Sequence, residues 1–139
     1  MGQYYRIFNT SKKESISPAA LGDGVKLLEF GCGGVTTAAL AVLLANSNGR
    51  GGGDLNAPYK NGKRIECPEI DKISGRWSGD SIVIQGDYAK EGDPSFISES
   101  ERENFKDISK LCIDALKFDG YFKEILEDSG LLKKKAVNS

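Results

Sequence analysis

The chain of 139 residues contains no histidine. Histidine is the side chain whose ordinary pKa lies near neutral pH, and it supplies the base of Ser-His-Asp triads and Cys-His dyads. An enzyme built from this sequence would have to use carboxylates, tyrosine, lysine or cysteine instead. The absence therefore favours a non-catalytic binding protein, and we expect no cofactor and no metal.

Long hydrophobic runs and an excess of one charge are also missing. The longest apolar run, residues 38–45, is too short to span a bilayer, and the N-terminal residues lack the apolar segment of a secretory signal. Nineteen basic residues face twenty acidic ones, a net charge of −1, so there is no overall attraction to phosphate backbones. We expect a soluble cytoplasmic protein without membrane contact, nucleic acid is disfavoured as a partner, and a homo-oligomer stays open.

Cysteine is scarce. Cys32, Cys67 and Cys112 are an odd number, far apart in the sequence. This pattern indicates neither a disulfide framework nor the ligand spacing of a zinc site. Reduced thiols are the expected state in the cytoplasm, and Cys112 falls on the apolar face of a predicted helix.

The length is typical of one domain. Residues 1–132 are predicted to form a single α+β domain, because strands and helices do not alternate strictly along the chain. We expect two β-hairpins in an antiparallel or mixed sheet, one buried central helix and two C-terminal helices. Residues 133–139, which contain three consecutive lysines, are predicted to be a disordered basic tail.

The predicted strands are runs of β-branched and aromatic residues next to turn residues. One hairpin is expected over 4–16. A second is expected over 72–88, with its turn at Ser78-Gly79-Asp80. A short strand over 25–30 should place Leu27 and Leu28 in the core.

The predicted helices follow from caps and apolar spacing. The central helix is expected through 38–44, with Thr36 or Thr37 as its N-cap. Ser98 and Glu101 match a capping box. Apolar residues at helical spacing mark the two C-terminal helices: Ile108, Leu111, Cys112, Ala115 and Leu116 in the first, and Phe122, Ile125 and Leu126 in the second.

Glycine is abundant, at 17 residues, and it concentrates in a loop over 46–54. Backbone amides without side chains, beside a guanidinium, can bind an anion or phosphate. We therefore weigh a ligand site in this loop against a flexible connector, which is the plainer explanation. The residues concerned are Arg50, Gly51, Gly52, Gly53 and Asp54.

The second candidate surface is the part of the predicted second hairpin that contains Arg76, Trp77 and Asp80. Arginine beside tryptophan can form a platform for a nucleobase or for a partner side chain. The alternative is that Trp77, the only tryptophan, packs in the core. Our hypothesis joins this surface with Arg50 and Asp54 in one binding site.

Two enzymatic alternatives remain. Residues 27–34 resemble the first motif of Rossmann-type methyltransferases, in which a strand, an acidic residue (here Glu29) and a glycine-rich turn hold S-adenosylmethionine. Val35 stands where a further glycine would be expected. The other alternative is a metal-dependent phosphoesterase, if the carboxylates of five Gly-Asp pairs converge on Mg²⁺. Those carboxylates belong to Asp23, Asp54, Asp80, Asp87 and Asp93.

Three strings of the chain also resemble a group of small uncharacterised proteins of bacteria and phages. These are residues 1–5, residues 48–55, and residues 75–80 together with 86–88. The resemblance covers the part of the chain up to the end of the predicted second hairpin and implies no activity. It implies a setting in mobile elements and their hosts, where a small phage-encoded protein would sequester an anionic signal nucleotide or block a host defence protein.

Overall fold

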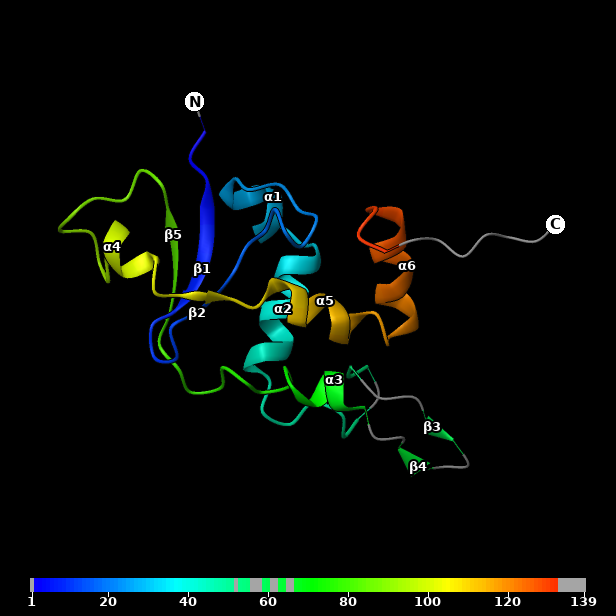
Figure 1. Cartoon of the computed structure of the whole chain (residues 1–139). Helices are drawn as coiled ribbons and strands as arrows, with labels where there is room; N and C mark the ends of the chain where they lie inside the picture. Colours follow the sequence, from blue (N-terminus) through cyan, green and yellow to red (C-terminus); the bar gives the residue numbers. More distant parts are fainter. Residues whose placement is uncertain (1, 52, 56–58, 61–62, 65–66, 133–139) are drawn as a thin grey trace.

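The structure is a computed structural model, and it describes residues 2–51, 53–55, 59–60, 63–64 and 67–132 (Figure 1). The predicted basic tail, 133–139, lies outside these residues. The described part is an α+β domain, as the sequence predicts.

A four-stranded mixed sheet forms one side of the domain. Its strands are β1 (Tyr5–Asn9), β2 (Glu14–Ile16), β5 (Ile82–Gly86) and β6 (Lys106–Asp107), in the order β5-β1-β2-β6. The hairpin of β1 and β2 confirms the first predicted hairpin. The β5 strand pairs antiparallel with β1, whereas β6 pairs parallel with β2.

The two faces of this sheet are covered differently. Ile7 in β1 lies opposite Ile16 in β2, and both are fully buried against the helices. On the other face, the ring of Phe8 packs edge-on against Phe105, with centroids 5.3 Å apart. Strand alternation explains this division, because successive side chains point to opposite faces.

The helices and two further short strands account for the rest of the described elements. They are α1 (Leu27–Gly31), α2 (Val35–Leu44), β3 (Tyr59–Lys60), β4 (Lys63–Arg64), α3 (Pro68–Asp71), α4 (Glu99–Arg102), α5 (Ser109–Leu116) and α6 (Gly120–Asp128). The α1 helix packs on α2, α3 packs on α5, and α5 packs on α6.

The strand predicted over 25–30 is wrong, since residues 27–31 form α1. The carboxylate of Glu29 accepts a hydrogen bond from the backbone N–H of Lys26 at 3.1 Å, which satisfies a donor at the start of the helix. Because α1 is only about one turn long, Phe30 is its one side chain that is buried in the core. Leu27 and Leu28 are consequently 42% and 71% exposed instead of buried.

The predicted caps of the central helix are also wrong. The α2 helix begins at Val35, so Thr36 and Thr37 lie inside its first turn. The carboxylate of Asp23 accepts the backbone N–H groups of Val35 and Thr36, at 3.3 and 2.7 Å. Gly34 makes this approach possible, because a Cβ there would lie 2.7 Å from the Asp23 carboxylate oxygen.

The second predicted hairpin is half right. The β5 strand forms, but its partner is β1, and the predicted first arm over 72–77 is a series of turns after α3. The backbone N–H groups of Gly75 and Trp77 donate to the carbonyls of Val42 and Leu43, at 3.0 and 2.8 Å. These carbonyls end α2 and need partners, so the segment caps that helix and is unavailable for a sheet.

The C-terminal predictions are confirmed in their main points. The capping box of Ser98 and Glu101 is present, although it starts a single turn, α4. Cys112 and Leu116 on α5 are fully buried, while Leu111 is half-buried. Within the described ranges, none of the helices combines the length and apolar character needed to cross a membrane.

Candidate functional site

The predicted anion loop is filled by the protein's own carboxylate. Asp54 accepts hydrogen bonds from the backbone N–H groups of Gly49, Arg50 and Gly51, at 3.0, 3.0 and 2.9 Å. These three bonds hold the pKa of the Asp54 carboxyl below its usual range. An external anion would have to displace Asp54 to reach the same amides.

The rest of this loop has a structural explanation too. The Asn48 side chain donates to the carbonyl of Leu55 at 2.7 Å and accepts its N–H at 2.8 Å, which closes the loop. Gly53 has a φ of +90°, a value that favours glycine. Arg50 is exposed, its side chain has no partner among the described residues, and Gly52 lies outside them.

The predicted arginine–tryptophan platform does not form. Trp77 is fully buried, and its Nε1 donates to the Oε1 of Glu14 at 2.9 Å. The Arg76 guanidinium donates to both oxygens of the same carboxylate through its Nε, at 3.0 and 3.2 Å. These bonds lower the pKa of Glu14, with Arg76 the main cause, and the same pair raises the pKa of Arg76.

Asp80 belongs to a third set of contacts. Its carboxylate accepts the Asn9 Nδ2 at 2.8 Å and the Lys12 Nζ at 2.6 Å, which lowers the pKa of Asp80. Within the described ranges, no hydrogen bond or ion pair joins residues 50–54 to Arg76, Trp77 or Asp80. The single composite site that the sequence suggested is therefore three separate structural clusters.

The five Gly-Asp carboxylates do not converge. Asp87 accepts the Tyr4 N–H at 2.8 Å, and Asp93 accepts the Lys90 N–H at 3.0 Å, while Asp23, Asp54 and Asp80 have the separate partners described above. In the described part of the chain, no group of three His, Cys, Asp or Glu side chains could hold a metal ion. Turn and cap formation explains these pairs.

The described residues also lack the strand and turn that the methyltransferase motif requires. Its first motif needs a parallel strand that ends in a glycine-rich turn. Residues 27–31 are helical, and α2 is preceded by Gly34 and the Asp23 carboxylate. The described sheet also lacks a strand–helix–strand unit at this position.

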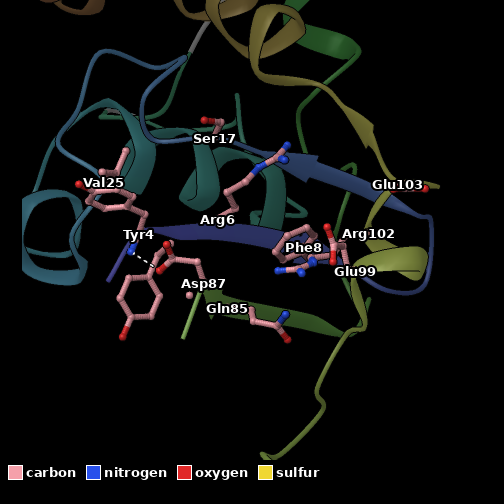
Figure 2. Close-up of a pocket in the computed structure, with 12 residues that line it drawn as sticks. Tyr4, Arg6, Phe8, Ser17, Val25, Gln85, Asp87, Glu99, Arg102 and Glu103 are labelled. Atoms are coloured by element: carbon pink, nitrogen blue, oxygen red, sulfur yellow. Dashed lines mark hydrogen bonds between the residues drawn. The ribbon is translucent and has the colours of Figure 1, made fainter. Parts of the chain in front are cut away.

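A cleft that the sequence did not reveal lies on the outer face of the sheet (Figure 2). It has a volume of about 510 Å³ and runs from the N-terminal segment along β1 to α4. Tyr4 lies at one end, near Asp87, and Arg102 of α4 lies at the other, near Phe8 (Figure 2). Tyr4 is 56% exposed.

Local contacts hold the walls of this cleft. The Gln85 side-chain amide donates to the carbonyl of Ile97 and accepts its N–H, both at 2.8 Å. This pair imitates one rung of a β-ladder and holds the chain before α4 against the sheet. The capping box then starts α4, which directs Glu99, Arg102 and Glu103 to the cleft.

Charged side chains of both signs line the cleft. The Arg6 guanidinium donates to Asp107 at 3.1 Å and lies over the Phe8 ring, 5.7 Å from its centroid. No hydrogen bond or ion pair joins the side chain of Glu99, Arg102 or Glu103 to another described residue. Sequence reasoning missed this set, since its members come from segments about a hundred residues apart; the only local signal was Arg6 alternating with the apolar Ile7 in a strand.

A second cleft, of about 500 Å³, lies beside α2. Its walls are mainly apolar side chains, among them Val42, Leu55 and Phe122, with Asp54 at the edge. The predicted loop thus borders a hollow, but with an ionised carboxylate that already accepts hydrogen bonds from its own backbone.

The fold and the first cleft define a small α+β protein with an open, mixed-charge surface. Comparison with protein-family models, with curated proteins and with solved structures gives no match to this chain. The functional argument therefore depends on the geometry of the cleft.

Proposed function

We propose that this chain is a non-catalytic binding protein that holds a segment of a partner protein in the cleft of Figure 2. One observation carries the proposal: a half-exposed tyrosine faces the same open hollow as charged side chains of both signs that have no partner among the described residues. Tyrosine and arginine are enriched where proteins contact one another. A tyrosine ring gives large contact area at a small cost in conformational entropy.

The charge of the lining favours a protein segment over a free anion. Two guanidinium groups, those of Arg6 and Arg102, are outnumbered by the carboxylates of Asp87, Glu99 and Glu103. The Arg6 charge is moreover already paired with Asp107. A signal nucleotide, the alternative ligand, would bring several negative charges beside these acids, whereas a peptide can offer a cation to them and an acid to Arg102.

Four carboxylates outside the lining of the cleft have shifted pKa values. Glu14, Asp54, Asp80 and Glu101 all have a lowered pKa, because each accepts hydrogen bonds that stabilise its ionised form. A general acid at neutral pH needs the opposite shift. These carboxylates therefore act as fixed hydrogen-bond acceptors in the fold.

The resemblance to small proteins of bacteria and phages supports a host defence protein as the partner. A phage-encoded chain of this kind would act by occupying a surface that the host complex needs. The chemistry expected of that surface is a segment with at least one acidic and one basic side chain, matching the lining of the cleft.

The test compares two charge reversals. Proteins that co-purify with the tagged chain from a bacterial host are identified by mass spectrometry, and the binding of each purified candidate is then measured by calorimetry. We expect Arg102→Glu and Tyr4→Ala each to weaken binding at least tenfold. The matched control is Arg50→Glu, which makes the same change on an exposed loop and should bind like the wild type.

Equal binding by Arg102→Glu and wild type would overturn the cleft as the site. Nucleotides are tested in parallel. Saturable binding of a nucleoside polyphosphate that Arg102→Glu abolishes would instead establish the small-molecule alternative.

A further inference from the structure

The two edges of the sheet are built differently. At one edge, β6 has two residues, Lys106 and Asp107, and both carry charge. At the other edge, β5 is five residues long, Ile82–Gly86, with neither a charged residue nor a proline. Its register with β1 continues without a bulge. Proteins usually protect an edge strand by shortness, charge, proline, a bulge or a covering helix or loop. The β5 strand has none of the first four, and the segment that follows it, with Tyr88, Ala89, Asp93 and Pro94, leaves a hollow of about 240 Å³ beside it.

The ends of the β1–β5 ladder show which backbone groups face outward. Thr10 donates its N–H to the carbonyl of Ser81, and Asp87 donates its N–H to the carbonyl of Tyr4, both at 2.9 Å. In an antiparallel pair, hydrogen-bonded and non-bonded positions alternate. This alternation assigns the residues between these two hydrogen bonds. The backbone N–H and carbonyl groups of Val83 and Gln85 are hydrogen-bonded to β1, and those of Ile82 and Ile84 point away from it.

The outward N–H and carbonyl groups of Ile82 and Ile84 have no backbone partner in the part of the chain that the structure describes, whereas the carbonyl of Gly86 accepts the N–H of Ala89 at 3.1 Å. The side chain of Ile84 shows the same lack of cover. It lies opposite the fully buried Ile7, on the face of the sheet that carries the core, yet it is 42% exposed. The apolar face thus continues beyond the covered core and ends at an open strand.

We propose that β5 pairs antiparallel with β5 of a second copy of this chain, around a two-fold axis at Ile84. In this register Ile84 lies opposite the partner's Ile84, and each donates its N–H to the other's carbonyl. Ile82 lies opposite Gly86 of the partner subunit. The dimer joins the two sheets into one of eight strands and covers both Ile84 side chains.

Two features favour a second copy over another partner. A two-fold axis places the same surface on both sides, so an uncharged strand meets an uncharged strand without repulsion. The register of β5 with β1 also places the outward N–H and carbonyl of Ile84 at the middle of the strand. A two-fold axis at that residue allows hydrogen bonds between the two copies on both sides of it. The inference is independent of the cleft, which lies on the opposite face of the sheet.

The experiment measures mass by light scattering after gel filtration, over a range of concentrations. We expect the wild type to be a dimer that dissociates on dilution and Ile84→Lys to be a monomer with an unchanged circular dichroism spectrum. The matched control is Leu28→Lys, the same change at a side chain that is 71% exposed on α1, and it should stay dimeric.

Hydrogen exchange of the wild type gives a second measurement that does not depend on any variant folding. In the dimer, the amides of Ile82 and Ile84 should exchange slowly at high concentration and quickly after dilution. Those of Val83 and Gln85 should be slow at both, because they bond to β1. A wild type that stays monomeric, a dimer that Ile84→Lys leaves intact, or another protein found at this edge would overturn the proposal.

Discussion

Trp77 and Glu14 form a hydrogen bond inside the core, in which the indole Nε1 donates to the Glu14 Oε1 at 2.9 Å. Glu14 begins β2, and Trp77 lies in the turns that follow α3. The contact therefore ties the first hairpin to the segment that caps α2. Because Arg76 donates to the same carboxylate, a buried acid is neutralised and hydrogen-bonded at once, as its burial demands.

Replacing Trp77 with phenylalanine removes the indole donor and keeps an aromatic ring. We expect Trp77→Phe to lower the free energy of unfolding by about 1–3 kcal/mol, the usual cost when a buried group loses a partner. Urea unfolding followed by circular dichroism measures the change. Unaltered stability combined with lost partner binding would contradict the core role and restore an exposed platform.

Acid should weaken the Glu14 contacts. The pKa of folded Glu14 lies below its ordinary value of 4.5, so its contribution is complete above that value and disappears as the pH falls through the lower folded pKa. The wild type should lose melting temperature steadily in this acid range. Glu14→Gln should be less stable at neutral pH, and its melting temperature should change less with pH than that of the wild type. A melting temperature that falls equally in both proteins as the pH is lowered would count against the contact.

Removing the carboxylate of Asp54 should free an anion site that the wild type lacks. Asp54→Ala exposes the N–H groups of Gly49, Arg50 and Gly51. We expect inorganic phosphate to raise the melting temperature of Asp54→Ala and to leave the wild type unchanged. Arg50→Ala serves as the control. Its exposed side chain has no partner among the described residues, so removing it should alter stability by less than about 0.5 kcal/mol. Equal stabilisation of the wild type would show that the loop binds anions despite Asp54.

The burial of α5 predicts an order between two leucine truncations. Leu116 is fully buried and Leu111 only half-buried. Leu116→Ala should cost about 2–5 kcal/mol, whereas Leu111→Ala should cost less, because part of its side chain already contacts water. Chemical denaturation of both variants decides the order, and the reverse result would mean that the helix faces the core with another side.

Some elements were predictable because their signals are local. The first hairpin, β5, the capping box of Ser98 and Glu101, and the apolar face of α5 all depend on residues within a few positions of each other. Periods of two and 3.6 residues and the chemistry of turns act at this range. The α+β class followed from the order of these elements.

Other elements could not be inferred, because their partners are distant in sequence. Residues 27–31 form an apolar run too short for periodicity to separate helix from strand. The cap of α2 comes from Asp23, twelve residues before Val35. The open edge of β5 exists because, among the described strands, β5 pairs on one side only, with β1, which is more than seventy residues away.

The candidate site shows the same division. By itself the sequence determined that histidine chemistry is absent, that glycines gather around Asp54, and that Arg76 and Trp77 are adjacent. Only the tertiary structure decided that Asp54 fills its own loop, that Trp77 is buried on Glu14, and that Tyr4 and Arg102 share a cleft. The reason is physical. Composition and residue spacing determine local structure along the chain, whereas the burial and pairing of a residue depend on which distant segments pack against it.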